Sequence, residues 1–223
     1  MDDFALIKSR HSVRIYKDRP LKEAHKKALE EKVEDLNQRE GVHFRLVWEE
    51  PKLFKQRVPS YGQFKNVHNY LLVAGDKDLD PMVLGYLGED FLLYAQSLGV
   101  NSCWVGMARF FNKNLVQEKG QKLFAVITLG YGINGGNPRP SKSLDQVTQG
   151  KKPYPDWFIR GVEASLLAPT ARNQQKFVIT LKDDGQVDFH HKRGFFARLD
   201  LGIVKYHFDL VTKSKGGEAW KSV

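Results

Sequence analysis

Hydrophobic and polar positions follow two rhythms along this chain, and the rhythms predict its secondary structure. Apolar positions on one face predict helices over residues 21–37 and 82–98. Residues 3–9 and 156–167 also look helical, and a last helix is predicted with Asp200 as its N-cap. Alternating or short apolar runs predict strands over residues 43–48, 70–75, 123–129, 176–182 and 186–191. Asp184-Gly185 predicts a hairpin turn between the last two strands.

Glycine and proline mark where regular structure is expected to stop. Residues 51–68 predict a loop, and residues 130–155 predict a linker or a crossing arm. Helices and strands mix without regular βαβ alternation. The pattern therefore predicts one α+β layered unit.

Composition narrows the class of protein. Of the 223 residues 41% are hydrophobic and 12% aromatic, which is enough for a substantial core. No apolar run approaches the ~20 residues that a membrane helix needs, and the acidic start lacks the pattern of a secretory signal. Cys103 is the single cysteine, so an intrachain disulfide and a cysteine-rich zinc site are excluded. We expect a cytoplasmic protein with no membrane partner.

The charge balance favours anionic partners. Lysine and arginine total 35 against 26 acidic residues, a formal charge of +9. A solvated basic surface would explain the charge equally well. Basic residues are scattered rather than gathered on one helix, which argues against nucleic acid as a partner. A basic nucleic-acid-binding module stays an alternative, and its binding would weaken steeply with salt.

Familiar catalytic patterns are missing or stand in the wrong context. Residues 130–135 fit G-x-G-x-x-G after a predicted strand, but Pro138 and Pro140 follow where a dinucleotide site needs a helix. We interpret these glycines as a strand exit. The seven histidines form no H-x-x-x-H pair, and no nucleophile elbow or phosphate-binding P-loop is present. No metal site and no catalytic protein nucleophile is predicted.

Two segments carry the candidate chemistry. Arg10-His11-Ser12-Val13-Arg14 offers two guanidinium groups, an imidazole and a hydroxyl, which suit phosphate oxygens. Residues 168–175, Ala-Pro-Thr-Ala-Arg-Asn-Gln-Gln, offer many groups that can hydrogen-bond a flat heteroaromatic edge. Alternatively, the first is an exposed basic turn and the second an ordinary helix-to-strand turn.

Taken together, the segments resemble the FMN-dependent nitroreductase family. Residues 9–16 look like its opening R-R-S-x-R-x-(F/Y) pattern, and residues 168–175 like its A-P-S-x-x-N-x-Q stretch. Three further stretches are similar to its central helix, its loop over the flavin and its late basic arm: residues 92–100, residues 103–106, and Arg139 and Lys142 with residues 143–147.

Two departures define the branch that the chain resembles. Gln175-Lys176-Phe177 replaces the usual Gln-Pro-Trp, and the A-P-S-like segment comes after residue 167 instead of soon after the opening motif. This order resembles a single-chain, pseudo-dimeric branch in which one polypeptide supplies both sides of the flavin. It implies a nitroreductase-like α-β-α layered fold with a mixed, mainly antiparallel sheet and two pseudo-symmetric halves. Residues 1–150 would form a nitroreductase-like half, and residues 151–223 an abbreviated second half packed on it.

The resemblance also implies the cofactor, FMN, and the residues that bind it. His11 belongs to the opening motif. Arg10 and Ser12, with Arg139 and Lys142, would take the phosphate, and Arg14 the ribityl chain and N1 edge. Val105 and Gly106 would present amides near N5. The remaining residues would contact the ring: Pro169, Thr170, Ala171 and Asn173 as its lining, and Ser60, Tyr61 and Gln63 at its pyrimidine edge.

The implied reaction has two steps. NADH or NADPH would give a hydride to FMN, and a small-molecule electron acceptor such as a nitroaromatic or a quinone would then take its place. The flavin would carry the chemistry, and no protein residue is predicted as catalytic. A flavin-binding protein of the same fold without nitroreductase turnover is the alternative. The chain is expected to be a monomer or a homodimer.

Overall fold

The computed structural model describes residues 2–55, 64–107, 115 and 118–213. They form two compact units, each assembled from separate stretches of the chain. The large-sheet unit takes residues 9–79 and 90–138, and the C-terminal unit takes residues 1–8, 80–89 and 139–223. The two halves expected from the family resemblance, 1–150 and 151–223, stay a prediction.

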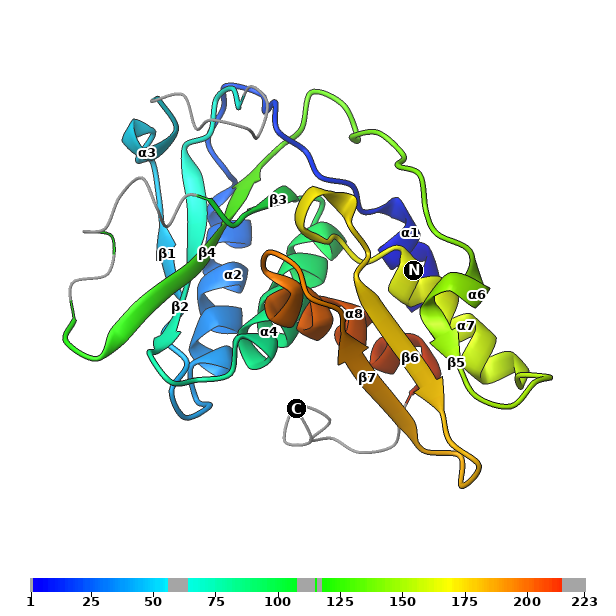
Figure 1. The fold of residues 1–223 in the computed structure, drawn as a ribbon. Helices are drawn as coiled ribbons and strands as arrows, with labels where there is room; N and C mark the ends of the chain where they lie inside the picture. Colours follow the sequence, from blue (N-terminus) through cyan, green and yellow to red (C-terminus); the bar gives the residue numbers. More distant parts are fainter. Residues whose placement is uncertain (1, 56–63, 108–114, 116–117, 214–223) are drawn as a thin grey trace. The chain divides into compact units, whose positions relative to one another are not determined.

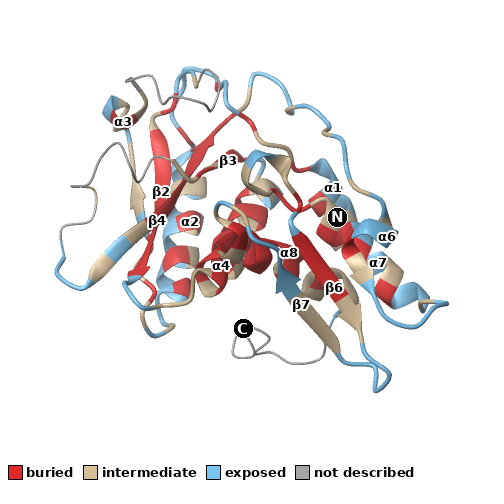
Figure 2. Ribbon diagram, viewed as in Figure 1, coloured by how far each residue is buried: buried red, intermediate tan, exposed pale blue. Residues whose placement is uncertain are grey.

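A four-stranded antiparallel sheet is the centre of the large-sheet unit (Figure 1). Its strands, in spatial order, are β1 (Arg45–Val47), β2 (Asn69–Asp76), β4 (Gln121–Gly130) and β3 (Asn101–Val105). β2 is buried from Asn69 to Gly75, and Figure 2 shows it and the later part of β4, from Phe124 on, as the buried middle of the sheet. A strand covered on both faces explains the continuous apolar run that predicted it.

Helix α2 (Glu23–Leu36) packs beside this sheet, next to β1 (Figure 1). Its buried residues Leu29, Val33 and Leu36 are spaced four and three apart, as the amphipathic pattern requires. A short helix, α3 (Lys52–Lys55), lies inside the stretch predicted as a loop. Helix α4 (Pro81–Ser97) begins in the C-terminal unit and ends in the large-sheet unit.

The C-terminal unit combines helices with a three-stranded sheet in the order β5-β6-β7. Helix α1 (Asp3–Ser9) belongs to this unit as far as Lys8. The other elements of the unit are α6 (Leu144–Val147), β5 (Thr148–Gln149), α7 (Asp156–Leu166), the 3₁₀ turn η2 (Ala171–Asn173), β6 (Phe177–Leu181), β7 (Val187–His191) and α8 (Ala197–Thr212). β5 runs parallel to β6, and β6 and β7 form the predicted hairpin. Gly185 has the positive φ of 83° that this turn requires.

Helix α8 is the buried centre of the C-terminal unit and packs against α7 and the start of α4. The backbones of α4 and α8 touch through two glycines. A Cβ atom at Gly202 would lie 1.9 Å from the Met82 carbonyl oxygen, and one at Gly85 would lie 2.1 Å from the Leu199 carbonyl oxygen. Any larger side chain at either position would therefore separate the two helices.

The predicted α+β class with mainly antiparallel pairing is confirmed, and two further local expectations are wrong. α8 begins at Ala197 with Phe196 at its N-cap, so Asp200 lies in the first turn instead of capping the helix. The stretch 130–155 holds α6 and β5, because a capping box of Ser143 and Gln146 starts a helical turn there. Among the described residues, no helix is both long and apolar enough to cross a membrane.

Candidate functional site

The predicted phosphate-binding segment runs through the large-sheet unit as extended backbone. The Val13 N–H donates to the Ser102 carbonyl at 3.0 Å, and the Tyr16 N–H donates to the Lys65 carbonyl at 3.1 Å. The Ile133 N–H donates to the Ile15 carbonyl at 3.1 Å. The alternative of a free, exposed basic turn is therefore wrong for this segment, because its backbone bonds tie it to the ends of β3 and β4.

Ser12, bridged to Ser102, hydrogen-bonds the thiol of Cys103, and the charges of Arg10 and Arg14 act on that thiol. Burial raises the pKa of that thiol, and Arg14, a hydrogen bond from Ser12, and Arg10 each lower it. Arg10 itself is only 4% exposed, and an arginine is almost never this buried unless its charge is paired. The structure thus brings together three of the predicted residues, two of them cationic, in one unit.

Two glycines of the G-x-G-x-x-G stretch serve packing. A Cβ atom at Gly130 would lie 2.6 Å from the ring of Tyr16, and one at Gly132 would lie 3.0 Å from Val13. Gly136, at a positive φ of 84°, approaches His11 in the same way. These glycines therefore let residues 11–16 pass close to the end of β4, and the interpretation as a strand exit agrees with this packing.

The expected flavin loop at residues 103–106 is wrong in part. Asn101–Val105 forms β3, whose residues pair with β4 from Asn101 opposite Gly130 to Val105 opposite Val126. Pairing with β4 satisfies a backbone that a loop would leave to water. Val105 is fully buried, and only Gly106, in the turn after the strand, lies outside it. Ser60, Tyr61 and Gln63 lie outside the described residues.

The second predicted segment is strained backbone in the C-terminal unit. Arg172 and Asn173 both have φ of 53°, and Gln175 has φ of 43°. A residue other than glycine held in this left-handed region costs on the order of 1–3 kcal/mol, and such residues gather at ligand sites. The alternative of an ordinary helix-to-strand turn does not explain three of them within four positions.

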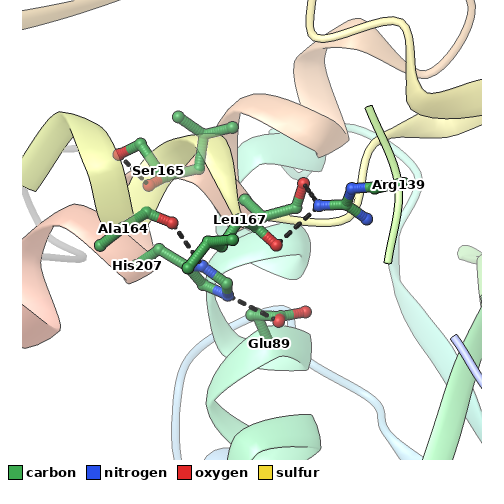
Figure 3. A network of polar contacts seen from close by, with 8 residues as sticks. Glu89, Arg139, Ala164, Ser165, Leu167 and His207 are labelled. Atoms are coloured by element: carbon green, nitrogen blue, oxygen red, sulfur yellow. Dashed lines mark hydrogen bonds and ion pairs between the residues drawn. The ribbon is translucent and has the colours of Figure 1, made fainter. Parts of the chain in front are cut away.

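The late basic arm holds this segment in place. Arg139 Nη2 donates to the Leu167 and Ala168 carbonyls, both at 2.6 Å, and Figure 3 shows it at the end of α7. Asn173 Nδ2 donates to the Pro140 carbonyl at 2.7 Å. The two bonds from Arg139 satisfy carbonyls just past the end of α7, and the bond from Asn173 ties residues 171–173 to the arm.

Lys142 and Gln175 form the other half of this connection. The Lys142 N–H donates to Gln175 Oε1 at 2.8 Å, and Lys142 Nζ donates to the Gln175 carbonyl at 2.6 Å. Burial lowers the pKa of Lys142, and the charges of Lys192 and Lys176 lower it further. The structure thus brings Arg139, Lys142 and residues 168–175 together, as two adjoining parts of one unit.

Two buried polar atoms lie beside the predicted residues without a hydrogen-bond partner among the described residues. They are the Ser102 hydroxyl, opposite Ser12, and Asn173 Oδ1. A buried polar group without a partner is costly, so each is a place for a donor or acceptor of a ligand. Two sets of residues have been described: residues 10–14, and Arg139 and Lys142 with residues 168–175. The side chains of each set fit a group such as FMN, which carries anionic oxygens and a ring with polar edges.

Three buried ionisable residues of the C-terminal unit, Glu89, Asp200 and His207, were not predicted from the sequence as site residues. Asp200 accepts hydrogen bonds from Ala171 and Gln174, and burial raises its pKa to about 7. His207 and Glu89 are both fully buried, and His207 Nε2 lies 2.8 Å from Glu89 Oε1. Figure 3 shows His207 between Glu89 and the Ala164 carbonyl. The sequence contained one signal for these residues: each is an ionisable side chain among the apolar positions of a predicted helix. The described residues include no group of three or more side chains suited to hold a metal ion.

The fold is of the nitroreductase type. A Thermotoga maritima protein described as a putative nitroreductase has a TM-score of 0.65 at 20% identity, over 95% of this chain and 83% of that one. A nitroreductase-like family protein from Bacillus cereus has a TM-score of 0.52 at 17% identity, over 66% of this chain and 94% of that one. A putative nitroreductase from Desulfovibrio desulfuricans, solved in complex with FMN, has a TM-score of 0.55 at 16% identity, over 69% and 98%.

The family follows from the sequence match. The model of the family described as "Putative TM nitroreductase" matches residues 4–212, nearly the whole chain. The chain therefore belongs to this nitroreductase family, as its motifs predicted. A search of the curated proteins gave no match.

Proposed function

We propose that this protein is an FMN-dependent NAD(P)H oxidoreductase that reduces nitroaromatic or quinone-type acceptors. The observation that carries the proposal is the buried Arg10 with Ser12 held beside Ser102 and Cys103, in a chain of the nitroreductase family. The D. desulfuricans structure, a relative in fold, contains FMN. When bound, FMN would supply the redox chemistry by taking a hydride from NADH or NADPH and passing it to the acceptor.

The proposal gives each group of residues a task that matches its chemistry. Arg10 and Ser12 bind the phosphate, because a buried guanidinium binds phosphate oxygens strongly and a hydroxyl adds a neutral donor. Arg14 places positive charge toward the N1 edge, where it favours the reduced, anionic ring. Arg139 and Lys142 donate to main-chain carbonyls beside residues 168–175, and they would bring basic side chains to that part of the site.

The remaining predicted residues would orient the ring. Asn173 offers an acceptor oxygen to a ring N–H group, and the backbone beside Pro169 packs against the ring. The last members of this proposed set are His11, Val105, Gly106, Thr170 and Ala171, with Ser60, Tyr61 and Gln63 outside the described residues. The formal charge of +9 would attract the anionic nicotinamide nucleotide.

Two measurements test the proposed function. The purified protein, reconstituted with FMN, is expected to show flavin absorbance, and mass analysis after denaturation should identify FMN. Steady-state oxidation of NADH and NADPH is then followed with a quinone and with a nitroaromatic acceptor. Bound flavin without turnover would show a flavin-binding protein instead, and absence of flavin binding would overturn the proposal.

Replacing Arg10 by alanine is expected to weaken FMN binding by ~1.5–3 kcal/mol, the contribution of a hydrogen bond to a charged group. That loss corresponds to a Kd about 10- to 150-fold higher, measured by quenching of flavin fluorescence on titration. Arg10→Lys keeps the positive charge but lacks the forked donors of the guanidinium. Its Kd for FMN should therefore lie between those of the wild type and Arg10→Ala. The matched control is Arg19→Ala, an exposed arginine of the same unit that stacks on Tyr131. Equal Kd values for Arg10→Ala and the wild type would contradict the role of Arg10.

A further inference from the structure

Three lysines of the C-terminal unit converge on the backbone at the start of β6. Lys142 Nζ donates to the Gln175 carbonyl at 2.6 Å, and the Lys192 N–H donates to the Lys176 carbonyl at 2.9 Å. Lys176 Nζ donates to the Arg193 carbonyl at 3.1 Å. Lys176 precedes β6 and Lys192 follows β7, so the two lie opposite each other at the end of the hairpin away from its turn (Figure 1).

The three side chains bring positive charges close together. Like charges on directly opposed residues of a β-hairpin repel each other. Burial lowers the pKa of Lys142, and the charges of the other two lysines lower it further. Among the residues that the structure describes, none of the three lysines forms an ion pair, and the acids of β7 and α6, Asp188 and Asp145, are paired with other lysines. An anionic ligand would compensate these charges.

The chemistry of lysine favours a phosphate monoester as this anion. Each ammonium group is a compact point charge with three donors, and lysine is a common ligand of phosphate. A phosphate monoester carries a charge of about −1.5 to −2 at neutral pH and three acceptor oxygens. A carboxylate or a phosphodiester carries a single negative charge. Three ammonium groups around one point therefore match the monoester best.

The backbone that carries the lysines is already ordered. The Lys142 N–H donates to Gln175 Oε1 at 2.8 Å, and Gln175 itself has a left-handed φ of 43°. A Cβ atom at Gly194 would lie 2.8 Å from Lys176 Cδ, so this glycine lets the chain after β7 pass close to the lysine stem. Lys176 and Lys192 are exposed. An ordered backbone with accessible ammonium groups lowers the cost of binding a ligand.

Two phosphate monoesters belong to the proposed reaction, the 5′-phosphate of FMN and the 2′-phosphate of NADPH, and the first is assigned above to Arg10 and Ser12. We propose that Lys142, Lys176 and Lys192 bind the 2′-phosphate of NADPH and thereby make NADPH the preferred electron donor. NADH has a hydroxyl group in place of this phosphate and is otherwise the same molecule. The choice of donor rests on the proposed function, whereas the affinity of the three lysines for a phosphate monoester does not.

Steady-state kinetics with the two donors test this choice. The FMN-saturated protein, with one quinone acceptor, is expected to show a higher kcat/KM for NADPH than for NADH. Lys176→Gln and Lys192→Gln should each raise the KM for NADPH by about fivefold, the upper end for an exposed ion pair, and leave the KM for NADH unchanged. Equal use of both donors by the wild type would overturn the proposal, as would an equal loss with both donors in the variants.

Two controls separate a binding site from general effects of charge and of folding. Lys182→Gln removes an exposed lysine of the same hairpin that is paired with Asp188, and it should keep the wild-type preference between donors. A similar loss of preference in this control would show an effect of net charge and overturn the proposal. The unfolding temperature of Lys192→Gln should equal that of the wild type or exceed it, because one repelling charge is removed. A lower temperature would show that Lys192 supports the fold and would contradict the proposal.

Titration with FMN distinguishes the two sources of the phosphate. The Kd for FMN, measured by quenching of flavin fluorescence, is expected to be the same in the wild type and in the double variant Lys176→Gln/Lys192→Gln. A higher Kd for FMN in the double variant, together with an unchanged preference between donors, would assign these lysines to the flavin phosphate and overturn the proposal.

Nucleotide binding gives a readout that needs no turnover. Isothermal titration calorimetry compares adenosine 2′-monophosphate with adenosine, which lacks the phosphate. The wild type should bind the monophosphate more tightly, and the double variant should lose most of this difference. Equal affinities in the wild type would overturn the phosphate site. Failure of the protein to oxidise either donor would overturn the proposed function and with it the choice of donor, while the two nucleotides would still decide whether the lysines bind a phosphate monoester.

Discussion

Replacing Glu89 by leucine is expected to lower the free energy of unfolding by about 3–5 kcal/mol, the largest effect of any single polar substitution proposed for this chain. Glu89 and His207 are fully buried, and Glu89 Oε1 lies 2.8 Å from His207 Nε2. His207 Nδ1 faces the Ala164 carbonyl at 3.0 Å and must donate to it. Leucine would leave His207 Nε2 buried without a partner, and the cost of that orphaned group dominates the effect.

Chemical denaturation at constant pH measures this loss. Glu89→Gln keeps a hydrogen-bonding partner for His207 and should cost much less. The double variant Glu89→Leu/His207→Leu should recover part of the stability, because an apolar pair replaces the polar pair. Glu163→Leu, at an exposed position of α7, is the control and should change stability by no more than about 0.5 kcal/mol. A loss below about 1 kcal/mol in Glu89→Leu would show that water reaches His207 and that the pair is not sealed.

Replacing Gly202 by alanine is expected to cost about 3 kcal/mol or more, beyond the usual range for overpacking by one methyl group. The added Cβ would lie 1.9 Å from the Met82 carbonyl oxygen and 2.7 Å from the Tyr86 backbone nitrogen. Both obstacles are backbone atoms of α4, so no side-chain rotation can relieve them, and the helices must move apart. The gain in helix propensity, about 1 kcal/mol, offsets only part of this cost.

Thermal unfolding followed by circular dichroism measures the effect. Gly85→Ala should behave alike, because its Cβ would meet the Leu199 carbonyl oxygen at 2.1 Å from the other side of the same helix contact. Gly135→Ala is the matched control, since no atom lies within 4 Å of its Cβ position, and its unfolding temperature should stay close to that of the wild type. A Gly202→Ala protein as stable as this control would contradict the close contact of α4 and α8.

Elements with a strong local pattern could be predicted from the sequence, and elements that depend on a partner could not. The period of α2 and the hairpin of β6 and β7 depend on nearby residues, so their positions were predicted within a few residues. β3 was missed because Asn101–Val105 is short and mixes polar with apolar residues. Its strand conformation comes from pairing with β4, which lies more than fifteen residues further along the chain.

The candidate site shows the same division. The composition of residues 10–14 and 168–175 was sufficient to predict two binding segments and the nitroreductase family. It could not predict that Arg139 donates to the end of α7, or that Lys142 is bound to Gln175. Both lysine and arginine can serve a ligand or a carbonyl equally well, and only the position of neighbouring backbone decides between them.

By itself, the sequence determined the α+β class, most helices and strands, and membership of a nitroreductase family, because periodicity and motif spacing are local properties of the chain. The tertiary structure alone decided which polar groups are buried. Glu89 and His207 are more than one hundred residues apart, and Asp200 meets Ala171 across the start of α8. Burial and hydrogen bonding of such distant groups are set by packing, and with them the charges, pKa shifts and strain on which the candidate site depends.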